Sequence, residues 1–223
     1  VVVIDRPLLS NGIQGNGGPW PSPRDRLLGL DAGGFGDPPE ARDLVAGYAA
    51  PVCGPASFLL GPGEILGIAG PNGCGKSTLL GAIAGGVRIF SGEIRRSPQL
   101  QVTLQTQQQP DIAGVPLSGR ELLALTAACA DGLPPWLAGR LDERLDQLSG
   151  GQRQYLHLWA CLQAPGDAVL LDEPTNNLDP AGVRHLAEAL RARAAAGAGL
   201  IVVSHDDDFV AAVCDRTLRL GAA

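Results

Sequence analysis

The segment that most constrains the fold of this chain is rich in glycine and lies between two apolar stretches. It reads Gly70-Pro71-Asn72-Gly73-Cys74-Gly75-Lys76-Ser77 and fits the pattern G-x-x-x-x-G-K-[ST]. Residues 64–69, just before it, form an apolar run typical of a buried strand, and residues 76–80 open a helix. A strand that turns tightly into a helix is a building unit of α/β proteins, in which strands alternate with helices.

The residue types in this segment suit the binding of phosphate groups. Glycine adopts backbone angles closed to other residues, so successive N–H groups of the loop can converge on phosphate oxygens, beside the positive end of the next helix. Lys76 is the one lysine among 17 basic residues and supplies a compact charge for the β- and γ-phosphates. The Ser77 hydroxyl is a ligand type for Mg²⁺. Residues from Gly70 to Thr78 are therefore candidate contacts for ATP; the alternative is a glycine-rich turn without function. Cys74 is interpreted as a small residue that fills the loop.

The rest of the chain alternates between short apolar runs and helical stretches from Asp43 onward. Residues 100–104, 168–171 and 200–203 are expected strands, and the last two have the continuous apolar character of parallel strands buried on both faces. Helices are expected over 121–130 and 151–162. Residues 1–40 contain eight Gly and six Pro without a regular period. Residues 1–42 are therefore predicted to be a disordered leader, with a small folded element around residues 27–30 as the alternative.

Composition limits the functions open to this chain. The 23 acidic and 17 basic residues give a formal charge of −6, which argues against nucleic-acid binding through a general basic surface. No apolar run approaches the ~18 residues that cross a bilayer, so we expect no membrane segment or signal peptide. The five cysteines are scattered, with no C-x-x-C pair, as in a cytosolic chain with reduced thiols.

Further motifs follow the glycine-rich loop in a fixed order. They are Leu148-Ser149-Gly150-Gly151-Gln152 at the start of a helix (the signature segment), Leu170-Leu171-Asp172-Glu173-Pro174 at the end of a strand, Asn177-Leu178-Asp179, and His205 after the last apolar strand. The ordered set resembles the ATP-binding cassette (ABC) ATPase family over about residues 43–221. The resemblance implies a P-loop NTPase fold of the α/β class: a three-layer sandwich with a mostly parallel sheet, an N-terminal antiparallel β portion and a helical insertion. The ATPase domain would span residues 43–223, with the helical subdomain at about 106–150.

Two adjacent acids follow the predicted strand at 168–171. A carboxylate at Asp172 can reach a metal ion from the end of a buried strand, and Glu173 is placed to act as the general base that polarises the attacking water. A solvated turn is the alternative. The resemblance implies that Lys76 and His205 complete the catalytic group, because His205 matches the histidine that contacts the γ-phosphate and steadies the water.

The signature segment offers a second phosphate site. Ser149 supplies a hydroxyl and Gly151 an unhindered N–H at a helix N-terminus, which is an anion-binding arrangement. By resemblance, Ser149, Gly150, Gly151 and Gln152 bind the γ-phosphate held by the opposite subunit, and Asp179 lies in the loop that links the two sites. This implies a head-to-tail homodimer or heterodimer of cassettes with two ATP molecules at its interface.

Two further site residues are assigned by position. Gln105 closes a predicted strand and resembles the glutamine that touches Mg²⁺ and relays motion to a partner, although residues 107–109 are glutamines as well and leave the register open. Tyr48 stands upstream of the loop, where the family stacks an aromatic ring on adenine; packing in the core is the alternative. His157 and His185 have no acidic or cysteine companions at ligand spacing and are interpreted as packing or surface residues.

The leading hypothesis is an ATP-hydrolysing subunit of an ABC transporter that works as a dimer and drives a separately encoded transmembrane permease. The complete motif set, the single cassette and the lack of a membrane segment favour it. It implies a cytoplasmic chain held at the inner face of the cell membrane by the permease, with no nucleic acid as partner. The likeness to short cassettes suggests a metal ion as the transported substrate. The alternative is a soluble ABC protein of the translation-factor class that acts on ribosomes, although such proteins normally carry two cassettes.

Overall fold

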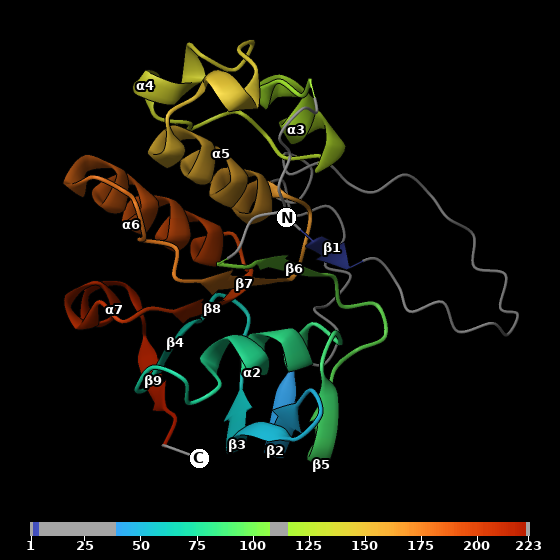
Figure 1. Cartoon of the computed structure of the whole chain (residues 1–223). Coiled ribbons are helices and arrows are strands. Elements are labelled where there is room, and N and C mark those ends of the chain that lie inside the picture. The colour runs from blue at the N-terminus through green and yellow to red at the C-terminus, as the bar shows by residue number, and fades with distance from the viewer. Residues whose placement is uncertain (1, 5–38, 108–115, 222–223) are drawn as a thin grey trace, which may run out of the picture.

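A computed structural model of the chain describes residues 2–4, 39–107 and 116–221, and residues 2–4 are described by their backbone (Figure 1). Within these ranges the strands form two sheets. The central sheet has the order β1 (Val2–Ile4), β6 (Val102–Gln105), β7 (Ala168–Asp172), β8 (Gly199–Val203), β4 (Ile65–Ala69) and β9 (Arg216–Arg219). Its strands are parallel except β1, which is antiparallel to β6. The second sheet is antiparallel, in the order β3 (Pro51–Leu59), β2 (Glu40–Gly47) and β5 (Arg88–Arg95).

The helices lie on both faces of the central sheet (Figure 1). In the described part of the chain they are α2 (Lys76–Ile83), α3 (Gly119–Leu125), α4 (Pro135–Ala138), α5 (Gly150–Gln163), α6 (Pro180–Ala195) and α7 (Asp207–Val213), with a 3₁₀ turn at Leu145–Gln147. None of them is both long enough and apolar enough to cross a membrane.

Successive side chains of the central strands point to opposite faces of the sheet, and this divides the core into two clusters. In β7, Val169 and Leu171 pack in one cluster with residues of α5 and α6, whereas Leu170 packs in the other with α2 and the antiparallel sheet. Every residue of β7 and β8 is buried, because successive side chains of a strand point to opposite faces and both faces are covered. The expected fold is thereby confirmed: a mostly parallel sheet between two layers, with an antiparallel β portion.

Some boundaries differ from those expected. Strand β2 begins at Glu40, inside the predicted leader of residues 1–42, and Val2–Ile4 form β1 through pairing with β6. Most of the predicted leader, residues 5–38, lies outside the described residues, as do residues 108–115 of the predicted helical insertion. The helix expected over 121–130 ends at Leu125, because Ala127 adopts a left-handed φ of 52° that a helix cannot continue through.

Candidate functional site

The glycine-rich loop joins the end of β4 to the first turn of α2. Gly75 precedes α2 with a φ of 91°, a left-handed conformation that glycine adopts freely. A Cβ at this position would lie 2.3 Å from the Cβ of Cys53, so the close contact between loop and β3 also requires glycine. No side chain caps α2, and no acidic residue lies in its first turn. The N–H groups there can therefore receive an anion.

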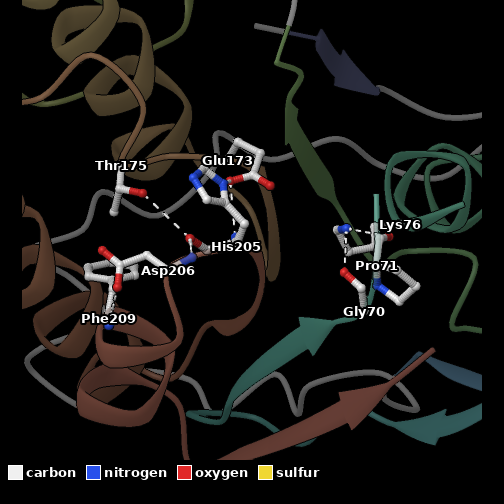
Figure 2. Close-up of polar contacts among 9 residues, drawn as sticks. Gly70, Pro71, Lys76, Glu173, Thr175, His205, Asp206 and Phe209 are labelled. Carbon is white, nitrogen blue, oxygen red and sulfur yellow. Dashed lines mark hydrogen bonds and ion pairs between the residues drawn. The ribbon is translucent and has the colours of Figure 1, made fainter. Parts of the chain in front are cut away.

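Lys76 directs its ammonium group over this loop. Its Nζ donates to the carbonyl oxygens of Gly70, at 2.8 Å, and of Pro71, at 3.0 Å (Figure 2). The side chain is buried. Both of these partners are neutral carbonyl oxygens, and a charged phosphate oxygen is a stronger acceptor for an ammonium group than a neutral carbonyl oxygen.

Asp172 ends β7 opposite the start of α2. Burial raises the pKa of this carboxyl group, while a hydrogen bond from the Ser77 side chain works in the opposite direction. Its Oδ1 atom is buried and has no hydrogen-bond partner among the residues that the structure describes. A buried carboxylate oxygen left unpaired beside a serine hydroxyl fits the ligand set of Mg²⁺, which takes one or two protein oxygens and phosphate oxygens. The described residues contain no cluster of three or more His, Cys, Asp or Glu able to hold a metal by themselves, so phosphate would have to complete the set.

Glu173 follows Asp172 with a left-handed φ of 52°, so the extended backbone of β7 ends at this residue. Its Oε2 atom lies 2.7 Å from Nδ1 of His205 and 3.3 Å from the His205 backbone nitrogen (Figure 2). The backbone N–H of Glu173 donates to Val203, at the end of the neighbouring β8. Because one carboxylate oxygen accepts both contacts from His205, the carboxylate is oriented and its Oε1 atom remains for a further partner.

These groups line one cavity of about 530 Å³. Its lining residues are Val52, Asn72, Gly73, Gly75, Lys76, Ser77, Thr78, Gln107, Asp172, Glu173, Asn176 and His205. The structure thus brings together the loop, the acidic pair and the histidine that the sequence predicted. Val52 and Asn176 carried no signal in the sequence, because their place at the cavity depends on strand and loop packing.

Five of the residues predicted to contact ATP or magnesium here do not line this cavity: Tyr48, Gly70, Pro71, Cys74 and Gln105. Gln105 is only 2% exposed, and its Nε2 donates to the carbonyl of Thr106, whereas Gln107 lines the cavity and hydrogen-bonds Asp172 through its backbone. Gln107, two residues later, thus lies nearer to Asp172 and the cavity than Gln105 does, while the metal contact predicted for Gln105 stays a prediction. Tyr48 lies in the turn between β2 and β3 with 67% of its surface exposed, so its stacking on adenine stays a prediction.

The signature segment lines a second cavity, of about 410 Å³. The lining residues are Trp136, Ser149, Gly151, Gln152, Asn177, Leu178, Asp179 and Gly182. Ser149 caps α5, since its Oγ accepts from the backbone N–H of Gln152, while the Gln152 side chain accepts from the backbone N–H of Ser149. A serine oxygen that accepts one bond still has its own hydrogen to donate. The Ser149 hydroxyl can therefore cap the helix and donate to a phosphate at the same time.

The two cavities lie on either side of one loop. Asn176 lines the first cavity and Asn177 the second, and no described residue lines both. Asp179, at the end of this loop, caps α6 through a 2.7 Å hydrogen bond from the backbone N–H of Gly182. The loop with Asp172 and Glu173 at its start and Asp179 at its end thus contributes to both.

Comparison with known sequences agrees with this geometry. A sequence model of the ABC transporter family matches residues 53–176. The hemin import ATP-binding protein HmuV of Pseudomonas fluorescens (strain Pf0-1) is 36% identical over 197 residues, which cover 74% of this chain and 75% of the relative. The zinc import ATP-binding protein ZnuC of Paracoccus denitrificans (strain Pd 1222) is 34% identical over 192 residues, which cover 81% of this chain and 74% of the relative.

Solved structures share the fold. An ATP-binding subunit of an ABC transporter has a TM-score of 0.70 at 25% identity, with 82% of this chain and 85% of that chain covered. An inward-facing metal-chelate type ABC transporter has a TM-score of 0.68 at 24% identity, with 82% and 79% covered.

Proposed function

The chain belongs to the ABC transporter family of ATP-binding proteins, and from this premise we propose that it hydrolyses ATP to drive the import of a metal ion or metal chelate. The observation that carries the ATPase function is the convergence of the glycine-rich loop, Asp172, Glu173 and His205 on one cavity. The substrate class is inferred from relatives named for hemin and zinc import.

The triphosphate would bind where backbone and side-chain donors meet. The N–H groups of the loop and of the first turn of α2 converge on the β- and γ-phosphates, and the Lys76 ammonium exchanges its two carbonyl partners for phosphate oxygens. Charged phosphate oxygens are stronger acceptors than neutral carbonyl oxygens, so this exchange is favourable. Tyr48, near Val52 in the chain, would cover the adenine.

Residues beside the phosphate site would hold a magnesium ion. Ser77, Asp172 and Gln107 would hold it, and it would neutralise charge on the β- and γ-phosphates. The unpaired Oδ1 atom of Asp172 and the position of Gln107 at the cavity support this set.

Hydrolysis requires a base near the γ-phosphate. Glu173 would take a proton from the attacking water through Oε1, because His205 already occupies Oε2. His205 would keep the carboxylate in this orientation and present its exposed ring to the γ-phosphate. Proton transfer to a positioned carboxylate is worth about 10²- to 10⁴-fold in rate.

We infer that the active unit is a dimer. In one chain the signature segment lines a cavity separate from that of the glycine-rich loop, so Ser149 and Gly151 would reach a phosphate held by a second cassette. A two-fold axis would pair each loop with the signature segment of the partner and so create two equivalent sites. The dimer would act on a separate transmembrane permease, which would keep this chain at the cytoplasmic face of the membrane.

The soluble, ribosome-acting alternative is not favoured. The relatives compared above are named as ATP-binding proteins of importers, and their similarity covers about three quarters of their length. Co-purification with a membrane permease would support the transport role, whereas co-sedimentation with ribosomes would contradict it.

Substitution of the base tests the ATPase mechanism. We expect Glu173→Gln to bind ATP with unchanged affinity and to lose at least ~100-fold in turnover, because the amide keeps the shape of the side chain but takes no proton. Lys76→Ala should instead weaken ATP binding itself. Fluorescent-nucleotide titration and phosphate release measure the two effects.

The control is Glu188→Gln, the same chemical change at an exposed position of α6 outside both cavities, which should leave both parameters unchanged. Normal turnover by Glu173→Gln would show that the base assignment is wrong.

A further inference from the structure

A partly buried hydrogen bond joins the helix of the signature segment to the helix that follows Asp179. Tyr155 on α5 is fully buried, with 0% of its surface exposed, and its hydroxyl lies 2.5 Å from Nδ1 of His185 on α6. In the sequence, His185 was interpreted as a packing or surface residue. The structure makes Tyr155 and His185 a polar contact between two helices whose first turns contribute to the second cavity.

The contact occupies equivalent positions on the two helices. Tyr155 lies six residues after Ser149, the cap of α5, and His185 lies six residues after Asp179, the cap of α6. Six residues of α-helix span about 9 Å. A hydrogen bond at this distance from the helix N-termini fixes their separation and relative rotation, since each helix is stiff over that length.

Two further contacts support the same pairing nearer to the cavity. The Asn177 side-chain amide donates to Oε1 of Gln154, at 2.9 Å. The backbone of Gly151 also approaches the loop so closely that an added Cβ would lie 2.9 Å from the carbonyl oxygen of Asn177. The signature segment and the loop at residues 177–179 are therefore packed directly together.

Aromatic rings hold Tyr155 in place. The ring of Trp136, which lines the cavity, meets the Tyr155 ring edge-on at 5.1 Å between centroids, and Trp159 stacks on it at 6.4 Å. Burial raises the pKa of the Tyr155 hydroxyl, so it keeps its proton at any physiological pH. A neutral hydroxyl surrounded by rings has one polar partner in these contacts, the His185 imidazole, and loss of that partner would leave it unsatisfied.

We propose that Tyr155 and His185 are positioning residues that hold Ser149 and Asp179 at the spacing needed to engage the ATP and the chain of a second copy. This inference rests on the proposed dimeric ATPase. Neither residue touches the nucleotide: the pair acts through the helix N-termini. Its loss should therefore impair assembly of the composite site and leave nucleotide binding to the glycine-rich loop intact.

Three substitutions test the pair, each made with and without Glu173→Gln. Tyr155→Phe keeps the ring and removes the hydroxyl. His185→Leu removes the polar partner, and His185→Asn keeps a polar atom where Nδ1 lies. We expect Tyr155→Phe and His185→Leu to lower kcat and to weaken ATP-driven dimerisation in the Glu173→Gln background about tenfold each, which corresponds to one hydrogen bond. Fluorescent-ATP affinity of the monomer should not change.

The conservative variant and the double variant separate positioning from general damage. His185→Asn should recover most of the dimerisation lost in His185→Leu. Tyr155→Phe combined with His185→Leu should be no worse than either alone, because both remove the same contact.

Several results would overturn the inference. Normal dimerisation in Tyr155→Phe, equal losses in His185→Asn and His185→Leu, or additive losses in the double variant would each do so. If Tyr155→Phe fails to fold, the two His185 variants still decide. Absence of ATP-driven dimerisation in Glu173→Gln alone would instead contradict the proposed function.

Discussion

His157 is a polar, titratable residue in an apolar environment. It lies on α5 with 3% of its surface exposed, and within the described part of the chain neither ring nitrogen has a hydrogen-bond partner. Burial lowers its pKa from 6.5 to about 4, and the like charge of Arg153 contributes in the same direction. The imidazole is thus held neutral inside the protein at pH values where it would be protonated in the unfolded chain.

This environment predicts a stability that falls in mild acid. The unfolded chain binds a proton at His157 from pH 6.5 downward, whereas the folded chain binds it only near pH 4. The free energy of unfolding that depends on neutral His157 is therefore fully present above pH 6.5 and is lost as the pH falls to about 4. The loss is roughly 3 kcal/mol at 1.36 kcal/mol per pKa unit. Urea unfolding at pH 7.5 and at pH 5 measures part of this loss.

The matched variant is His157→Leu, which fills the site without a titrating group. It should lose less stability than the natural chain between the two pH values. Carboxylates titrate in both proteins, so the difference between their changes in the free energy of unfolding from pH 7.5 to pH 5 comes from His157. Equal changes in the two proteins would mean that His157 is not held neutral.

Single residues also show the limit of sequence reasoning. The motif spacing predicted Lys76, Ser77, Asp172 and Glu173 at one cavity, because each stands at a strand end or helix start that the apolar pattern locates. It could not decide which glutamine follows β6, since the residue at which the chain leaves the sheet is set by pairing: Gln105 still pairs with Leu171 of β7. The metal contact of Gln107 remains a prediction.

Among the helices that the structure describes, α3 and α5 both begin with a capping box. Ser118 caps α3 in a reciprocal pair with Glu121, and Ser149 caps α5 in a reciprocal pair with Gln152. Each serine accepts a backbone N–H three residues later, and each partner side chain accepts the N–H of the serine. Only the second helix opens on a cavity with a proposed phosphate role. Removal of the Ser118 cap is therefore a control for removal of the Ser149 cap, because it removes the same helix-capping hydrogen bond without a proposed phosphate contact.

We expect Ser118→Ala and Ser149→Ala to reduce the free energy of unfolding by about 1 kcal/mol each, the usual cost of losing an N-cap. Only Ser149→Ala should also lower kcat, because its hydroxyl hydrogen is proposed to reach the phosphate of the partner. Denaturant unfolding and phosphate release on both variants make the comparison. Equal activity in the two variants would reduce Ser149 to a helix cap.

Whole helices and strands were predictable where their burial produces a regular pattern of apolar residues in the sequence. Strands β7 and β8 and helix α5 fall within one or two residues of their expected ranges, because a strand buried on both faces and a helix with one apolar face leave clear patterns. Strand β1 was not predicted, since three residues gain a strand conformation only through pairing with β6, about 100 positions away in the sequence. The end of α3 depended on the backbone of Ala127 in the same way.

At the scale of the molecule, the proposed ATPase sites are divided between two cavities. The glycine-rich loop, the acidic pair and His205 belong to one, and the signature segment belongs to the other. If a site is completed by a second copy, Lys76→Ala damages the site on its own chain's loop, while Ser149→Ala damages the site on its partner's loop. Each homodimer then has two defective sites.

A mixture of the two variants should regain activity. In a mixed dimer, the intact loop of the Ser149→Ala chain faces the intact signature segment of the Lys76→Ala chain, so one of two sites is whole. Random pairing of equal amounts makes half of the dimers mixed, which predicts about one quarter of the natural rate if the sites act independently. Phosphate release measured across mixing ratios should peak at equal amounts. A chain that carried a complete site by itself would give no gain at any ratio, because every chain in the mixture would still hold one of the two defects.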